Sequence, residues 1–246
     1  MNIAVCVKEV PSGTSHKRLD PATNRLDRSG DSELNPFDLH ALEEAVRIRE
    51  GGAERERLLE RALGADRAVL VSDDSLAGSD IAGTAHVLAA VVAKQDADLV
   101  LLGQQAADAD CYVMAAAVAD HLERPVVTQV ADLTVDGSGI RAKRQTEHGY
   151  DVIEAPLPAV VSVSDAINTP RLPSIKAIMG AKKKPLETLS AADAGVDAGQ
   201  VGESGAHSVV RSVAPPAAKS AGVTIEDSGG DSAGQVVELL AGKGLI

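Results

Sequence analysis

The chain has 246 residues, which is enough for one large α/β domain with appendages or for two small domains. A formal net charge of −12, with only two Tyr, one Phe and no Trp, disfavours nucleic-acid binding, which needs basic surfaces and aromatic stacking platforms. No stretch approaches the roughly 20 apolar residues that cross a bilayer, and no signal peptide is apparent, so we expect a cytoplasmic protein.

The first half of the chain alternates short apolar runs with stretches of helical periodicity. The runs are rich in Val, Leu and Ile, as expected of buried strands, and the helical stretches repeat apolar residues every three or four positions. A polar excursion at residues 12–33, with a small hairpin around Asn24 and Arg25, interrupts the alternation. The sequence therefore predicts strands at residues 2–7, 68–71 and 98–102, and helices at residues 35–50, 54–63, 83–94 and 111–122.

The second half changes to short β-type runs separated by turns, which predicts a stretch of hairpins. Beyond residue 190 the chain is rich in Ala, Gly, Ser and Pro, and we expect an extended tail that ends in a short helix at residues 235–240. The expected domains are therefore residues 1–190 and the tail, residues 191–246. Strands are predicted at residues 125–130, 133–135, 140–144, 150–154 and 159–163.

This alternation favours an α/β fold with a mostly parallel sheet and helices on both faces. Ligands of such sheets bind outside the carboxyl ends of the strands. Three segments are expected at that edge, namely residues 7–11, 35–38 and 103–110, so we expect a binding cleft there.

The loop at residues 103–110 is the strongest site candidate that the residues themselves indicate. It joins a buried strand to a helix N-terminus, whose free backbone N–H groups attract phosphate. Asp108 or Asp110 could accept a hydrogen bond from a ribose hydroxyl or could simply cap the helix, and both alternatives stay open. Asn35 to Asp38 is also compatible with an ordinary helix start, and Lys182 to Lys184 with a solvated helix end.

No catalytic or metal-binding motif is evident. The sequence contains no Ser-His-Asp order, HExxH, GxGxxG or phosphate-binding P-loop, and its six histidines are scattered. The two cysteines, Cys6 and Cys111, provide neither a disulfide framework nor metal-ligand spacing. The residues themselves thus indicate an α/β domain with a candidate adenine-nucleotide cleft, and no enzyme chemistry.

Several segments, taken together, match a known family. They include residues 7–11 (VKEVP), 35–45 (NPFDLHALEEA), 98–105 (DLVLLGQQ), 168–171 (NTPR) and 178–184 (IMGAKKK). In this order they resemble the β (small) subunit of electron-transfer flavoproteins. The resemblance runs from Met1 to about Val196 and, more loosely, to the end of the chain.

The resemblance implies an adenine-nucleotide α-hydrolase-like fold and a heterodimer in which an α subunit holds most of a redox-active FAD. This chain would be an electron-carrier subunit rather than an enzyme, with its tail packed on the α subunit and an AMP without redox role in its own cleft. The residues that would line this cleft are Cys6, Asn35, Pro36, Phe37, Asp38, Gly103, Gln104, Gln105, Ala106, Asp108, Asp110 and Cys111.

The resemblance also implies transient redox partners. Flavin dehydrogenases, such as the acyl-CoA dehydrogenases of fatty acid β-oxidation, would donate electrons, and a membrane quinone oxidoreductase would accept them. Ile175 stands where the family has an apolar anchor for acyl-CoA dehydrogenases, and a basic run flanks it. The residues expected to bind partners are Ile175, Ile178, Met179, Lys182 and Lys183.

The sequence departs from the family pattern at two places. Val113 and Met114 offer no polar side chain to a phosphate, and Tyr112 and Met114 are candidates for crowding the cleft. A strand is also missing after Gly52, which would leave an unpaired edge or a rewired sheet. The alternative functions are an ATP- or AMP-binding module and a nucleotide hydrolase of the same fold class, both without a redox partner.

Overall fold

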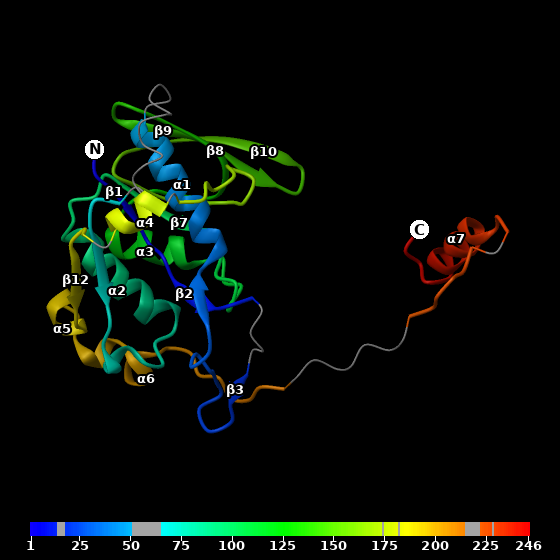
Figure 1. The fold of residues 1–246 in the computed structure, drawn as a ribbon, viewed down its shortest axis with the longest axis horizontal. Helices are drawn as coiled ribbons and strands as arrows, with labels where there is room; N and C mark the ends of the chain where they lie inside the picture. Colours follow the sequence, from blue (N-terminus) through cyan, green and yellow to red (C-terminus); the bar gives the residue numbers. More distant parts are fainter. Residues whose placement is uncertain (14–17, 51–64, 174, 182, 215–221, 228) are drawn as a thin grey trace. The chain divides into compact units, whose positions relative to one another are not determined.

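The computed structural model describes residues 1–13, 18–50, 65–173, 175–181, 183–214, 222–227 and 229–246, and Figure 1 shows the fold. These residues form two compact units, Met1–Val210 and Arg211–Ile246. The first unit extends 20 residues beyond the boundary expected at 190. Its extension is held by apolar contacts, because Ala194, Val196 and Val201 are buried in one cluster with Val87 and Val91.

A six-stranded sheet forms the centre of the first unit. Three neighbouring pairs in this sheet are parallel and the last two are antiparallel, so the expected α/β class with an attached hairpin stretch is confirmed. A single long strand replaces the two expected at residues 125–130 and 133–135, with an irregularity between Val130 and Asp132. The strand order is β1 (Ile3–Val5), β7 (Leu99–Gly103), β11 (Ala159–Val163), β8 (Val126–Asp136), β9 (Gly139–Thr146) and β10 (Gly149–Pro156).

Helices cover both faces of this sheet, as Figure 1 shows. Side chains alternate along β7, so that Leu99 and Leu101 pack with Ala41 of α1 (Pro36–Glu50). On the opposite face, Val100 and Leu102 pack with α2 (Ile81–Ala93) and α3 (Met114–Leu122). All four β7 side chains are at most 4% exposed, which explains why this strand is a continuous apolar run in the sequence.

The ends of the main helices follow local sequence signals. The side chain of Asp80 caps α2 by accepting a hydrogen bond from Gly83 N at 3.1 Å. α3 ends at Leu122, and the next residue, Glu123, adopts a left-handed conformation. α3 begins three residues later than predicted, because the chain first makes a turn in which Asp110 N donates to Ala106 O and Asp110 has φ 45°.

Smaller elements complete the first unit. β3 (Leu19–Asp20) and β4 (Arg25–Leu26) form the hairpin predicted around Asn24, which has φ 55°. The first unit has further small elements, of which only β6 was predicted. They are β2 (Glu9–Pro11), β5 (Ser32–Leu34), β6 (Ala68–Val71), β12 (Leu186–Leu189), α4 (Ile175–Ala181), α5 (Ala191–Ala194), α6 (Gly202–Gly205) and the 3-10 turns Asp74–Leu76 and Ala198–Gln200.

The sheet is interrupted beside β1. Within the described parts of the chain, β1 pairs only with β7, while β6 pairs in parallel with β12 in a separate two-stranded sheet. The helix predicted at residues 54–63, and the place after Gly52 where a strand is expected to be missing, lie outside the described residues.

The second unit contains one helix, α7 (Ser232–Gly242), among the residues that the structure describes there. The helix predicted at residues 235–240 lies within it. Across both units, none of the described helices combines the length and the apolar character that a bilayer-crossing helix requires.

Candidate functional site

Three segments meet at the carboxyl ends of β1 and β7, and we call this place the strand-end site (Cys6, Lys8, Asn35–Asp38 and Gly103–Asp108). The carboxylate of Asp38 joins all three segments, because it accepts hydrogen bonds from Lys8 N at 2.8 Å and from Gly103 N at 3.2 Å. Asn35 N donates to Lys8 O at 2.8 Å. The edge at which the topology places ligands is therefore built from the residues that the sequence singled out.

Asp38 is a buried carboxylate with only 6% of its surface exposed. Burial raises the pKa of this carboxyl group to about 6, although the hydrogen bonds from Asn35, Lys8 and Gly103 oppose the shift. Its place in the first turn of α1 also suits a negative charge. This carboxyl group therefore fixes two backbone segments, and its pKa lies well above the ordinary value of 3.8.

Asn35 fixes the loop that follows β7. Its side-chain amide donates to Gln105 O at 2.9 Å and its side-chain oxygen accepts from Ala107 N at 3.1 Å. Asn35 is 1% exposed, so both bonds are shielded from water. The segment at residues 35–38 is thus a helix start, as the pattern predicts, and at the same time the support of the candidate binding loop.

Asp108 is held by two cations. Lys8 Nζ lies 2.7 Å from one carboxylate oxygen, and the guanidinium of Arg28 bonds the other. Burial would raise the pKa of this carboxyl group, but these two side chains outweigh burial and lower it. Capping of α3 by Asp108 or Asp110 was one expected alternative, yet the cap position is Val113, with no side-chain bond.

The other residues expected in the cleft differ in exposure. Cys6 packs partly buried between β7 and α3, where burial and the nearby Asp38 carboxylate raise the pKa of its thiol to about 12. Gln104 N donates to Val163 O at 3.0 Å, which ties the loop to β11. Pro36 and Asp110 are exposed, and Phe37, Ala106 and Cys111 are half-buried.

Two features of this site lack a side-chain hydrogen-bond partner in the part of the chain that the structure describes. The side-chain oxygen of Gln105 is buried and has no hydrogen-bond partner among the described residues. The first turn of α3 carries no side-chain cap, so its N–H groups are available to an acceptor. Tyr112 and Val113 are about half exposed, whereas Met114 packs against the apolar clusters beneath α2 and α3. Met114 is therefore directed toward the core.

A separate cavity of about 420 Å³ lies beside α2 and α3. It is lined by His86 and His121, whose rings are 5.0 Å apart in an edge-to-face arrangement, and by residues of the segment 199–207. It contains none of the residues expected to bind nucleotide. Among the described residues, no cluster of His, Cys, Asp or Glu has the arrangement of a metal site.

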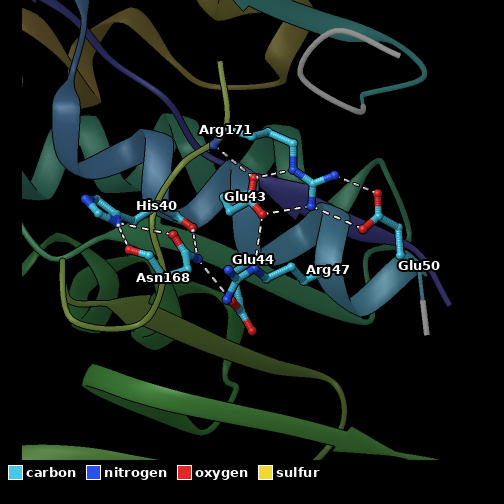
Figure 2. Close-up of polar contacts among 7 residues, drawn as sticks. All are labelled: His40, Glu43, Glu44, Arg47, Glu50, Asn168 and Arg171. Carbon is cyan, nitrogen blue, oxygen red and sulfur yellow. Dashed lines mark hydrogen bonds and ion pairs between the residues drawn. The ribbon is translucent and has the colours of Figure 1, made fainter. Parts of the chain in front are cut away.

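A second polar cluster joins α1 to the chain that follows β11, and we call it the α1 network (His40, Glu43, Glu44, Arg47, Glu50, Asn168 and Arg171). Figure 2 shows the guanidinium of Arg171 between the carboxylates of Glu43 and Glu50. Arg171 donates through Nε and Nη2 to Glu43 at 2.8 Å each, and through Nη1 and Nη2 to Glu50 at 2.9 and 3.1 Å. Both carboxylate side chains are at most 5% exposed.

The other half of the network is centred on Asn168. Its amide nitrogen donates to His40 O and to Glu44 Oε2, both at 3.0 Å. Burial raises the pKa of Glu44, with the bond from Asn168 opposing it, whereas for Glu43 the bonds from Arg171 outweigh burial and lower the pKa. Arg47 also bonds Glu43, at 3.0 Å, within α1 itself.

An exposed apolar segment follows directly after the α1 network, and we call it the α4 segment (the described residues 172, 173 and 175–181). Leu172 is 91%, Ile175 79%, Met179 65% and Ile178 48% exposed. Lys183, just beyond it, is also exposed, and Lys182 lies outside the described residues. The residues expected to bind partners are thus gathered on one surface segment, apart from the strand-end site.

The sequence did not reveal Lys8 and Arg28 as partners of Asp108, or Arg171 as the partner of Glu43 and Glu50. Residues 35–45, which contain Glu43, and residues 168–171 both stood out as segments that match the family. What was missing was their spatial relation, since Arg171 lies 128 residues from Glu43 and 121 from Glu50 in the chain.

Comparison with known proteins agrees with this architecture. The electron transfer flavoprotein domain family matches residues 23–194. The electron transfer flavoprotein subunit beta of Mycobacterium leprae is 37% identical over all of this chain and 99% of its own length. That of Thermoanaerobacterium thermosaccharolyticum is 36% identical, and the caffeyl-CoA reductase-Etf complex subunit CarD of Acetobacterium woodii is 34% identical, both over the full length of both chains. The chain therefore belongs to the family of electron transfer flavoprotein β subunits.

Proposed function

We propose that this chain works in the cytoplasm as one half of a heterodimer that carries electrons between other flavoproteins. An α subunit would hold most of the FAD, flavin dehydrogenases such as acyl-CoA dehydrogenases would deliver electrons, and a membrane quinone oxidoreductase would receive them. The observation that carries the proposal is the end-to-end similarity to electron transfer flavoprotein β subunits. When bound, FAD supplies the electron chemistry, and the protein sets its surroundings.

The strand-end site would hold AMP. The residues present fit a mononucleotide, because Gln105 offers a buried acceptor without a partner and the first turn of α3 offers uncapped N–H groups. Asn35 and Asp38 would keep the loop in place without touching the redox reaction. Val113 and Met114 are compatible with this role, because backbone groups alone supply the donors and Met114 is turned toward the core.

The α4 segment would meet the electron donors. It presents Ile175, Ile178 and Met179 to solvent with Lys183 beside them, an apolar anchor with a charged rim. Such a surface suits short-lived encounters, in which a charged rim increases the association rate and a small apolar contact allows rapid release. An electron carrier that alternates between partners needs both properties.

Reduction by a dehydrogenase tests the proposal. The chain is purified together with its α subunit, and the flavin absorbance is followed after adding an acyl-CoA, and an acyl-CoA dehydrogenase from the same organism in catalytic amount. We expect rapid reduction that depends on the dehydrogenase. An Ile175→Ala heterodimer should be reduced about tenfold more slowly, as for loss of a central apolar contact. A flavin that stays oxidised in the parent heterodimer contradicts the proposal.

A further inference from the structure

We propose that Arg171 is a positioning residue for partner docking, and that its bonds to Glu43 and Glu50 hold the α4 segment in the orientation that redox partners recognise. The inference deepens the proposed function and rests on it. Figure 2 shows the arrangement on which it depends, with Arg171 placed between two carboxylates of one helix. We call the hydrogen bonds of Arg171 to Glu43 and Glu50 the Arg171 clamp.

The clamp is strong because of its geometry. Each carboxylate receives two hydrogen bonds from the guanidinium, and Glu43 also accepts from the backbone N of Arg171 at 3.3 Å. Paired bonds of this kind fix the direction of a guanidinium as well as its position. Glu43 and Glu50 are 5% and 3% exposed in their side chains, so water competes little for these bonds. The backbone of Arg171 is therefore fixed to α1.

The clamp is linked to docking because Arg171 directly precedes the α4 segment in the chain. Asn168, bonded to His40 and Glu44, holds the same stretch three residues earlier. Leu172, directly after Arg171, is 91% exposed, and the described side chains from there to Ala181 are exposed as well. Arg171 is thus the last anchored residue before the α4 segment begins.

A second anchor lies at the other end. Lys184 Nζ donates to Ala65 O, and Ala68 N donates to Pro185 O at 3.0 Å, which begins the pairing of β12 with β6. The α4 segment therefore spans two fixed points. Its described side chains contribute little burial, so the two ends must set its direction. Of the two, the Arg171 end is attached to α1, the helix whose first turn supports the strand-end site.

Replacing Arg171 with Lys tests whether the paired hydrogen bonds, and not only the positive charge, are needed. Arg171→Lys keeps the positive charge, but a single ammonium cannot make the paired bonds to two carboxylates. The matched control is Arg47→Lys, because Arg47 bonds the same Glu43 from within α1 and holds no part of the chain after β11. Glu43→Gln breaks the clamp from the helix side and is used alongside Arg171→Lys, should either heterodimer be recovered poorly.

The heterodimers are compared by stopped-flow reduction with a reduced acyl-CoA dehydrogenase and, separately, with dithionite. We expect Arg171→Lys and Glu43→Gln to lower the second-order rate with the dehydrogenase about tenfold, and Arg47→Lys to change it less than about twofold. FAD content and the dithionite rate should stay at parental values, which a general structural defect would not allow. Either clamp variant reacting with the dehydrogenase at the parental rate overturns the proposal.

A double variant shows whether Arg171 acts through the α4 segment. If it does, Arg171→Lys with Ile175→Ala is no slower than the slower of the two single variants, because both changes damage the same contact. If the rate losses of the two single variants multiply in the double variant, the proposal is overturned. A parent heterodimer that the dehydrogenase cannot reduce contradicts the proposed function itself, and this inference with it, whereas an active parent with unaffected clamp variants contradicts this inference alone.

Discussion

Asp38 and Gly103 are in direct contact at the strand-end site, where Gly103 N donates to the Asp38 carboxylate at 3.2 Å. A Cβ atom at position 103 would lie 2.6 Å from the same carboxylate oxygen and 2.6 Å from the carbonyl carbon of Phe37. Glycine is therefore required for the end of β7 to approach the start of α1 so closely. The contact joins the two segments that the candidate nucleotide site needs.

We predict that Gly103→Ala destabilises the protein by about 1–3 kcal/mol, because either the helix start or the loop must move. The matched control is Gly30→Ala, since a Cβ there would meet nothing within 4 Å. The control should stay within about 0.5 kcal/mol of the parent. Urea unfolding measures both, and equal stability of Gly103→Ala and the parent would show that the contact is not tight.

The raised pKa of Asp38 predicts a specific pH dependence. The folded protein holds this proton up to about pH 6, whereas the unfolded chain releases it near the ordinary value of 3.8. The free energy of unfolding should therefore fall as the pH rises through this range, by up to about 3 kcal/mol relative to Asp38→Asn. Unfolding in urea at pH 4, 5, 6 and 7 gives the two curves, and parallel curves would refute the assignment.

The two carboxylates on Arg171 predict a large cost of removing it. Arg171→Ala leaves Glu43 and Glu50 buried without their main partner, and breaking buried pairs in this way costs about 3–5 kcal/mol. Arg144→Ala, which removes an exposed pair with Asp151, should cost less than about 1 kcal/mol.

The stability that the pairing of Arg171 with Glu43 contributes depends on pH in a defined way. The pKa of Glu43 is lowered in the folded state, so the stability it contributes is present above its ordinary value of 4.5 and is lost as the pH falls through the lowered value. The deficit of Arg171→Ala should therefore shrink on acidification. A deficit that grows toward low pH would mean that the guanidinium does not stabilise the ionised carboxylates.

Cys6 should resist alkylation in the native protein. The thiolate is the reactive form, and a thiol whose pKa is about 12 is almost entirely protonated at pH 8. Treatment with iodoacetamide at pH 8 followed by peptide mass spectrometry should leave Cys6 unmodified and modify it fully in urea. Rapid labelling of Cys6 in the native protein would show that the pKa of its thiol is not raised.

Much of the fold could be predicted because the information is local. Within the strand predicted at residues 98–102, residues 99–102 are a continuous apolar run, and β7 is buried on both faces. β6 has the predicted bounds, Ala68–Val71. The start of α3 was predicted three residues too early. The turn that ends at Asp110 depends on a left-handed backbone conformation, which an Asp can adopt but which its presence does not predict. β12 was missed because its partner β6 lies more than 100 residues earlier.

The site was predictable only at the level of segments. Asn35, Asp38 and the loop after Gly103 were expected at one edge of the sheet, and they do meet there. The role of Asp108 was not foreseeable, because Lys8 and Arg28 reach it from 100 and 80 residues away. Which charged residues pair with one another depends on the tertiary structure, and that structure cannot be read from a single sequence.

The nucleotide content of the purified heterodimer tests the central claim most directly. This chain and its α subunit are co-expressed and purified, the complex is denatured, and the released FAD and AMP are quantified per heterodimer. We predict a stable complex that releases one FAD and one AMP. A chain that forms no complex with the α subunit, remains folded alone and yields no flavin would contradict the account.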